Sequence, residues 1–278
     1  MGVIEAVILG VVQGLTEFLP VSSSGHLVLL QKIFGISEPA LLFDTMLHVG
    51  TLAAVLAVLR NDILSILKKI NQPLTAYLVI ATVPTVAAAL VFRKPLEKAF
   101  ETGRYLGFAF LATSALLALA ELLAKRAVKG RTAGPAGSGR ENAAAMTWPD
   151  ALVVGIMQAV AVIPGISRSG ATLSGALSRG LDRGFAARFS FLLSIPAILG
   201  AAVLQLKDIA KTGAETAESG IGAAAIIAGT LSAAVVGFFA VRLMLKIVRE
   251  KSLWGFAAYT GVLGLLVLLD RFAFHFVF

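Results

Sequence analysis

Six apolar stretches, each about as long as a bilayer-crossing helix, limit what this chain can fold into. They cover residues 41–59, 73–92, 105–124, 189–206, 220–241 and 252–269. A helix needs about 20 mostly apolar residues to cross the hydrocarbon core of a membrane. Only 14% of the residues are charged, which is well below the share found in soluble domains. We therefore predict an all-α polytopic membrane protein with about six transmembrane helices.

Two further apolar regions are interrupted, and the parts on either side of each interruption are too short to span. Residues 3–30 are broken around Pro20, and residues 151–178 are broken around Pro164. Irregular backbone at membrane depth is tolerated only where it lines a cavity inside the protein. We predict that each region forms a re-entrant helical hairpin, which enters the membrane and returns to the same side.

The two interrupted regions also resemble each other in sequence. With a shift of 145 positions, six residues of the first region coincide with identical residues of the second. The matching pairs are Ala6 and Ala151, Gly10 and Gly155, Gln13 and Gln158, Ser22 and Ser167, Ser24 and Ser169, and Gly25 and Gly170. Each half would then consist of one hairpin followed by three spans. A hairpin leaves the chain on the side where it began, and three spans move it to the other side, so the second half starts from the opposite side of the membrane. Such an arrangement is an inverted-topology repeat. We predict a first repeat at residues 1–130, a flexible linker at residues 131–149, and a second, inverted repeat at residues 150–278.

The net charge of +8 does not indicate a nucleic-acid-binding protein, because the basic residues lie between apolar runs. Loops rich in Lys and Arg usually face the cytoplasm. When the loop at residues 60–69 is placed inside, 15 Lys and Arg residues fall inside and eight outside, although the loop at residues 93–104 goes against this arrangement. The distribution predicts that both termini lie outside.

The interruption in the first region brings a carboxylate, three hydroxyls and an imidazole into a short segment. These groups belong to Glu17, Ser22, Ser23, Ser24 and His26. Ionisable groups inside a bilayer are costly and usually functional. The serines can cap the following helix, whose free N–H groups would form a natural phosphate site. The alternative is a capped helix turn with a hydrogen-bonded histidine and no further role.

The interruption in the second region carries hydroxyls and one arginine, at Ser167, Arg168, Ser169 and Thr172. A guanidinium can hold two phosphate oxygens at once and stays charged when partly dehydrated. The alternative is a structural ion pair between Arg168 and Glu17, which is compatible with phosphate binding once a ligand arrives.

Other polar and aromatic residues carry weaker predictions. Gln13 and Gln158 are either cavity hydrogen-bonding groups or core residues, and Asp44 and His48 are predicted to form a supporting ion pair on one helix face. The aromatic residues predicted to anchor helices at the membrane interface are Trp148, Trp254 and Tyr259.

Both motifs resemble those of the undecaprenyl-diphosphate phosphatase family, also called the bacitracin resistance protein family. The segment from Glu17 to His26 resembles its E-F-L-P-V-S-S-[ST]-G-H signature, and Pro164 to Thr172 resembles its P-G-x-S-R-S-x-x-T signature. Gln13 with Glu17 resembles its (E/Q)xxxE motif. The resemblance extends over essentially the whole chain, in length and in the order of the spans.

The resemblance implies a hydrolase that converts undecaprenyl diphosphate to undecaprenyl phosphate and inorganic phosphate. It implies a multi-pass protein of the bacterial plasma (inner) membrane that recycles the lipid carrier for peptidoglycan synthesis and confers bacitracin resistance. It also implies dependence on a divalent cation, Mg²⁺ or Ca²⁺, with Glu17 and Gln13 as metal-binding residues, and an inverted-repeat fold.

We hypothesise that one cavity holds the catalytic residues Glu17, Ser23, His26 and Arg168. The substrate-binding residues would be Gln13, Ser22, Ser24, Ser167, Ser169 and Thr172. Ser23 is the favoured nucleophile, with Ser22 or a water as rivals, and His26 would take its proton because residues three apart share a helix face. We expect the site to open to the periplasmic side.

Two rival functions follow from the same residues. A polyprenyl-phosphate transporter or flippase would also use inverted repeats and a phosphate site. The second rival is a type 2 phosphatidic acid phosphatase, because Ser24-Gly25-His26 resembles the S-G-H element of that class. The K-x6-R-P motif of the class is missing from this sequence. The prenyl chain length, the preferred metal and the oligomeric state stay open, with a homodimer as one assembly to test.

Overall fold

Every regular element in the computed structural model is a helix, wherever the structure describes the chain. The described residues are 1–36, 40–92, 95, 105–129, 143–212 and 221–277. Among them, six helices are long and apolar enough to cross a membrane: α3 (Leu41–Val58), α5 (Pro73–Val91), α7 (Leu106–Lys129), α10 (Arg183–Thr212), α11 (Ala223–Glu250) and α12 (Trp254–Leu269). The predicted all-α polytopic architecture with six spans is confirmed. Helices α10 and α11 extend beyond the predicted spans because their ends carry charged residues, which an apolar run does not include.

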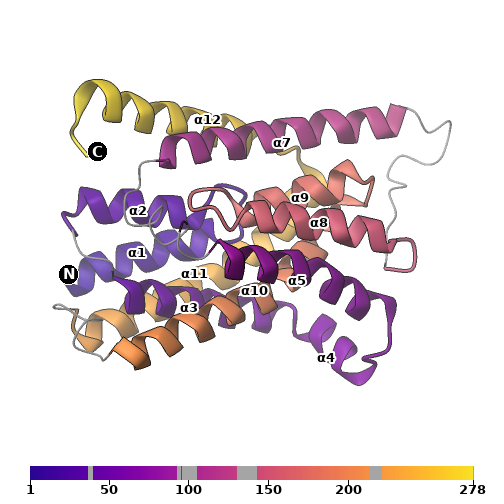
Figure 1. Ribbon diagram of the computed structural model, residues 1–278, viewed down its shortest axis with the longest axis horizontal. Helices are drawn as coiled ribbons and strands as arrows, with labels where there is room; N and C mark the ends of the chain where they lie inside the picture. The colour runs from indigo at the N-terminus through magenta and orange to yellow at the C-terminus, as the bar shows by residue number, and fades with distance from the viewer. Residues whose placement is uncertain (37–39, 93–94, 96–104, 130–142, 213–220, 278) are drawn as a thin grey trace.

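Two pairs of shorter helices lie between the long ones. The first helix pair consists of α1 (Val3–Thr16) and α2 (Ser23–Ile33), and the second consists of α8 (Trp148–Val160) and α9 (Arg168–Ser178). Figure 1 shows the first pair in one half of the molecule's length and the second in the other half, with their connecting loops toward the middle. Both chain termini lie at the end where α1 begins. A short amphipathic helix, α4 (Arg60–Lys68), and a π-helical turn, η2 (Asp270–Phe274), complete the described elements.

The predicted linker at residues 131–149 falls largely outside the described residues. Its last part belongs to α8, because a capping box starts that helix earlier than we expected. The carboxylate of Asp150 accepts hydrogen bonds from both the backbone N–H and the hydroxyl of Thr147, at 2.9 and 2.6 Å.

The first helix of each pair packs against a long helix of the other half of the chain. Helix α1 lies on α11 and α8 lies on α5. A Cβ atom at Gly10 would overlap the carbonyl oxygen of Gly229, and one at Gly155 would overlap the carbonyl oxygen of Ala81. Since Gly10 and Gly155 are related by the shift of 145 positions, the two contacts occupy matching places and interleave the halves.

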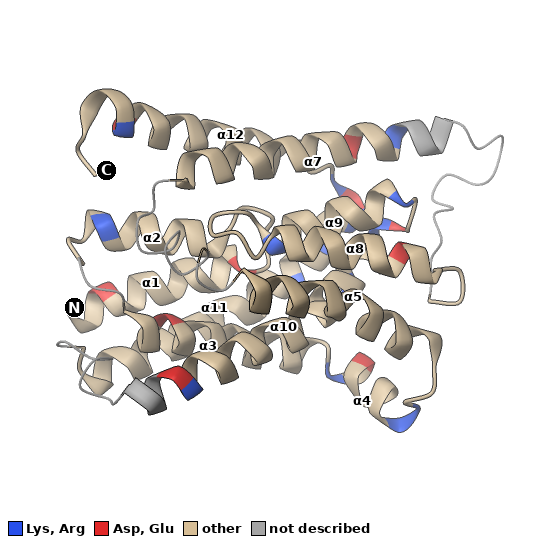
Figure 2. Ribbon diagram, in the orientation of Figure 1, with Lys and Arg blue, Asp and Glu red and all other residues tan. Residues whose placement is uncertain are grey.

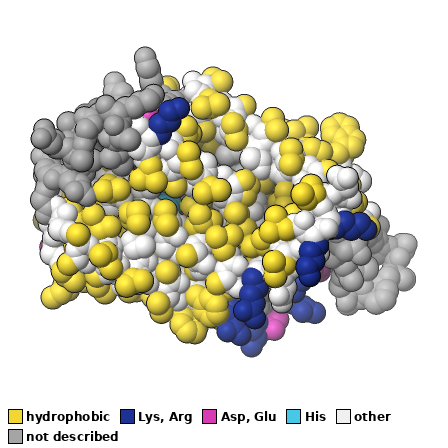
Figure 3. Space-filling view, turned by 90° about the horizontal axis from the view of Figure 1, so that it is seen from below, with side chains coloured by type: hydrophobic (Ala, Val, Ile, Leu, Met, Phe, Trp, Pro, Cys, Tyr) yellow, Lys and Arg dark blue, Asp and Glu magenta, His cyan; other side chains and the backbone are white. Residues whose placement is uncertain are grey.

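Charged side chains gather toward the ends of the helices, and few lie at mid-length (Figure 2). The surface is largely hydrophobic in the view of Figure 3, with Lys and Arg at its edges. Two buried carboxylates at one end are neutralised by arginines, Glu121 by Arg183 at 2.6 Å and Asp150 by Arg179 at 2.8 Å. This distribution suits a protein whose middle is surrounded by lipid.

Candidate active site

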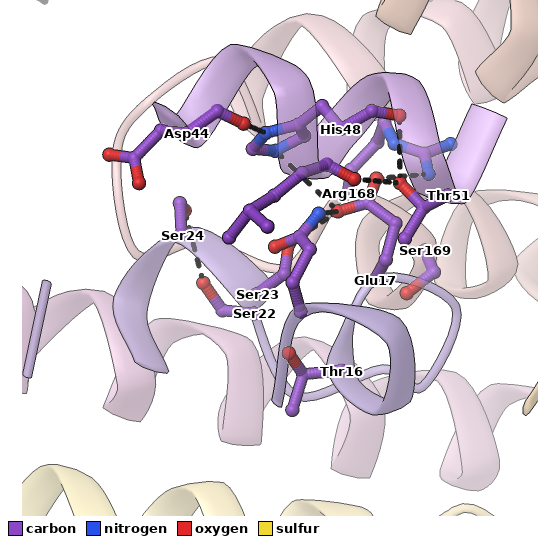
Figure 4. A network of polar contacts seen from close by, with 12 residues as sticks. Thr16, Glu17, Ser22, Ser23, Ser24, Asp44, His48, Thr51, Arg168 and Ser169 are labelled. Carbon is purple, nitrogen blue, oxygen red and sulfur yellow. Dashed lines mark hydrogen bonds and ion pairs between the residues drawn. The ribbon is translucent and has the colours of Figure 1, made fainter. Parts of the chain in front are cut away.

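The carboxylate of Glu17 is the centre of a buried polar cluster between the two helix pairs. One oxygen, Oε1, accepts a hydrogen bond from Nη2 of Arg168 at 3.0 Å. The other, Oε2, accepts from Oγ of Ser23 at 2.5 Å and from Nε2 of Gln13 at 3.0 Å. Figure 4 shows the side chains of Glu17, Ser23 and Arg168 converging from the end of α1, the start of α2 and the start of α9. Because Glu17 is only 6% exposed, its charge depends on these donors.

The backbone at Ser22 determines where the neighbouring side chains point. Ser22 has φ of 72° and ψ of 96°, a conformation that residues with a Cβ rarely adopt. Its hydroxyl accepts the N–H of Gly25 at 3.2 Å and caps α2. Ser23 then begins the helix with its hydroxyl turned toward Glu17. The strained residue therefore lies at the point where a carboxylate and a hydroxyl must meet.

His26 does not hydrogen-bond to Ser23, although the sequence suggested that pairing. Its Nδ1 lies 2.7 Å from the carbonyl oxygen of Ser22, and its Nε2 lies 2.7 Å from the hydroxyl of Tyr259 on α12. Both ring nitrogens therefore have other partners. Tyr259, predicted as an interface anchor, also lies against this histidine.

A second imidazole, from His48 on α3, faces the same carboxylate. Its Nε2 lies 3.7 Å from Oε2 of Glu17, while its Nδ1 hydrogen-bonds to the backbone carbonyl of Asp44 at 2.7 Å. The carboxylate of Asp44 points away in Figure 4 and accepts from Nε2 of Gln31 at 2.7 Å. The predicted ion pair on one helix face thus takes a different form, with His48 turned to Glu17. The sequence feature that pointed to a role for His48 is its position as an ionisable residue inside an apolar span.

Two hydrogen bonds each join the first turn of a helix in one pair to the loop of the other pair. The hydroxyl of Ser169 donates to the carbonyl of Leu19 at 2.9 Å, and the N–H of Gly165 donates to the hydroxyl of Ser24 at 3.3 Å. Ser167 caps α9 by accepting the N–H of Gly170 at 3.1 Å. The structure thus brings the serines of both motifs together around the meeting point.

Thr172 is a predicted site residue whose hydroxyl makes its contacts within α9 and with α10. Its hydroxyl bonds to the backbone carbonyls of Arg168 and Ser169, at 2.9 and 3.2 Å, and contacts the hydroxyl of Ser190 on α10. The side chain is fully buried in the packing of α9 against α10. The hydroxyl of Thr172 therefore links α9 to α10.

Two buried polar atoms of the cluster lack a hydrogen-bond partner within the described part of the chain. They are Nη1 of Arg168, a donor, and Oε1 of Gln13, an acceptor. Leaving such atoms unpaired costs free energy, which a ligand can recover. Helices α2 and α9 also begin here, so the positive ends of two helix dipoles meet at the cluster. The arrangement suits an anionic ligand rich in acceptor oxygens, such as phosphate.

The described residues contain no group of three or more His, Cys, Asp or Glu side chains that could hold a metal ion. Glu17 contributes one carboxylate, and the unpaired amide oxygen of Gln13 contributes a second hard donor. Mg²⁺ commonly uses one or two protein carboxylates together with phosphate oxygens and waters. These two residues therefore fit a cation only in combination with a phosphate-bearing ligand.

The fold and the cluster together define a polytopic helical membrane protein with a buried acid, hydroxyl, imidazole and guanidinium site. The family model described as bacitracin resistance protein BacA matches residues 6–266. The chain is 48% identical over 269 residues to undecaprenyl-diphosphatase of Carboxydothermus hydrogenoformans, covering 97% of each chain. It is 42% identical to undecaprenyl-diphosphatase 3 of Bacillus cereus, covering 98% of each, and 36% identical to undecaprenyl-diphosphatase of Methanosphaera stadtmanae, covering 97% of this chain and 98% of the relative. The chain belongs to the bacitracin resistance protein family.

Proposed function

We propose that this protein hydrolyses undecaprenyl diphosphate to undecaprenyl phosphate and inorganic phosphate, recycling the lipid carrier used for peptidoglycan synthesis. The relatives named above carry this activity in their names. The observation that carries the proposal is the shared carboxylate of Glu17, which bonds a hydroxyl from one helix pair and a guanidinium from the other. Phosphoryl transfer depends mainly on positioning and charge neutralisation, and this arrangement supplies both.

Arg168 is the main binding group for the diphosphate in this proposal. Its Nη1 is buried, has no partner among the described residues, and can donate to a phosphate oxygen without breaking the bond from Nη2 to Glu17. The N–H groups in the first turns of α2 and α9 add donors at the same place. The prenyl tail lies among the apolar helices.

Ser23 is the proposed nucleophile, and Glu17 is the group placed to take its proton. Oγ of Ser23 attacks the terminal phosphorus, its proton passes to Oε2 of Glu17, and the bond from phosphorus to the bridging oxygen breaks. Undecaprenyl phosphate leaves with that oxygen. Water then hydrolyses the phosphoserine, releases inorganic phosphate and restores the hydroxyl. The hydrogen bond of 2.5 Å between Ser23 and Glu17 makes Glu17 the nearer acceptor, in place of His26.

The imidazole of His48 and a cation complete the site in this proposal. Nδ1 of His48 donates to the carbonyl oxygen of Asp44, so Nε2 is the nitrogen that faces Glu17. The Mg²⁺ or Ca²⁺ expected from the sequence would be held by Glu17 and by Oε1 of Gln13, and would neutralise phosphate charge.

The membrane arrangement completes the proposal. We infer that each helix pair is a re-entrant hairpin and that the halves form an inverted repeat. The matching glycine contacts at Gly10 and Gly155 support this, as do the two serine caps at Ser22 and Ser167. With both termini outside, the site opens to the periplasmic face of a plasma membrane. A homodimer stays a prediction.

The test uses purified protein in detergent with undecaprenyl diphosphate labelled on the terminal phosphate. We expect release of labelled phosphate, its loss with a chelator, and a fall of about 1,000-fold in Ser23→Ala. Brief reaction followed by denaturation should leave label on Ser23. Near-normal turnover by Ser23→Ala would replace the phosphoserine route with direct attack by water. Lipid movement between leaflets without phosphate release would favour a flippase instead.

A further inference from the structure

The ring of His26 is held by three separate elements of the fold. Its Nδ1 contacts the backbone of Ser22 in the loop before α2. The ring of Tyr259 from α12 lies nearly parallel to it, with centroids 5.7 Å apart and planes at 9°, and the ring of Phe110 from α7 meets it edge-on at 5.4 Å. The imidazole is 8% exposed, so its orientation is set by these contacts rather than by solvent.

The partners of His26 also determine which nitrogen carries the proton. A carbonyl oxygen only accepts hydrogen bonds, so Nδ1 must donate to Ser22. In the neutral ring, Nε2 is then an acceptor and takes the hydroxyl proton of Tyr259 in a bond of 2.7 Å. When the ring is protonated, Nε2 becomes a donor and the same hydroxyl can accept. A tyrosine hydroxyl therefore satisfies Nε2 in both charge states.

We propose that Tyr259 is a positioning residue for the reaction, because it fixes the tautomer and direction of His26 and lets that ring change charge without losing a partner. The inference rests on the proposed function and goes beyond it by giving His26, on the same helix as Ser23, a charge that changes during turnover. A phenylalanine at this position would leave the N–H of protonated His26 buried without an acceptor, which disfavours the charged ring.

Helix α12 does not depend on the Tyr259 hydroxyl for its place in the fold. It lies along α7 (Figure 1), and the hydroxyl of Ser114 on α7 donates to the carbonyl of Ala257 on α12 at 2.7 Å. Tyr259 is 48% exposed, so removing its hydroxyl leaves no cavity in the core. Tyr259→Phe is therefore expected to fold and to keep the ring contact with His26.

The kinetic test compares Tyr259→Phe with Tyr77→Phe. Tyr77 is the matched control because it lies on α5 and packs against the main apolar core. We expect kcat of Tyr259→Phe to fall about 10-fold with KM nearly unchanged, and Tyr77→Phe to match wild type. Tyr259→Phe should have no further effect in a His26→Gln background, because the hydroxyl acts through His26. A kcat within about twofold of wild type, or full effects in both backgrounds, would overturn the inference.

An independent test reads the tautomer directly. The chain has three histidines, so ¹⁵N-histidine labelling gives few signals, and His26→Gln identifies those of His26. We expect the Nδ1–H tautomer in wild type and a shifted Nε2 signal in Tyr259→Phe, with His48 and His275 unchanged. An unchanged Nε2 signal would refute the contact. This result stands even if wild-type protein releases no phosphate, an outcome that would count against the proposed function alone.

Discussion

The two helix pairs have the same elements at matching positions, and yet they contribute different functional groups to the polar cluster. In each pair a serine caps the second helix, Ser22 for α2 and Ser167 for α9, and accepts an N–H three residues further on. Each pair also bonds to the loop of the other, through Ser24 in one case and Ser169 in the other. The shared scaffold thus supplies two helix N-termini at one point.

The difference lies in the residues between the shared ones. The shift of 145 positions relates Ser23 to Arg168, Glu17 to Val162, and His26 to Ala171. The first pair contributes the acid, the hydroxyl and the imidazole, whereas the second contributes the only guanidinium that reaches Glu17 within the described residues. In the proposed reaction, one helix pair therefore supplies the reacting groups and the other supplies charge for the phosphate.

The largest expected effect concerns the acid of the first pair. In Glu17→Gln the amide can neither take the proton of Ser23 nor neutralise Arg168, so kcat should fall by about 1,000-fold. Phosphate release by purified protein measures it. Glu121→Gln is the control, because it removes another buried, arginine-paired carboxylate; it should lower thermal stability while the folded protein keeps its kcat. Equal losses of kcat in both variants would contradict a special role for Glu17.

The next effect concerns the guanidinium of the second pair. Arg168→Lys keeps the charge but loses the second N–H group that would reach a phosphate, so kcat/KM should fall by about 100-fold. Steady-state phosphate release measures the change, and the exposed Arg188→Lys provides the matched control. Wild-type kinetics for Arg168→Lys would show that two-point binding is not used.

A smaller effect separates the two glutamines at matching positions. Gln13 donates to Glu17 at 3.0 Å, whereas Gln158 donates to the hydroxyl of Thr85 at 3.0 Å. Gln13→Ala should lower kcat about 10-fold, and Gln158→Ala should change it less than twofold, although both lose one buried hydrogen bond. If both variants lose activity equally, the second pair takes a more direct part in catalysis than its contacts indicate.

The smallest expected effect on activity comes from the glycine contacts that the two helix pairs share. Gly10→Ala and Gly155→Ala both force a Cβ against a backbone carbonyl of a neighbouring helix, so each should destabilise the fold by about 1–3 kcal/mol. Thermal unfolding followed by tryptophan fluorescence in detergent measures this, and kcat of the folded fraction should hold. A loss of stability in only one variant would show that the two contacts are not equivalent.

The spans could be predicted from the sequence because apolar runs are local patterns, and the convergence of the two motifs was predicted from the similarity of the two interrupted regions. The apolar runs marked the long helices, and the ion pair between Arg168 and Glu17 followed from two charges inside interrupted regions. The partner of Ser23 could not be predicted, since it depends on the positive φ of Ser22, which turns Ser23 toward Glu17.

The contacts of His48 and Tyr259 were missed for a different reason. Both lie inside long apolar helices and reach the cluster only through tertiary packing, which sequence spacing does not show. A tyrosine in an apolar span usually indicates an interface anchor, and only the structure reveals its contact with His26. Thr172 was assigned to the cluster by its motif, but its hydroxyl bonds back to its own helix.

The interleaved packing of α1 on α11 and α8 on α5 has a consequence for biosynthesis. When α1 leaves the ribosome, the helix that carries Gly229 has not yet been translated, so α1 must wait in the membrane or at its surface for nearly the whole chain. Contacts between distant parts of a chain form late and slowly. The amino-terminal half on its own would leave uncovered the side of α5 on which α8 packs. Two halves expressed separately should therefore assemble only when both are inserted in the same membrane.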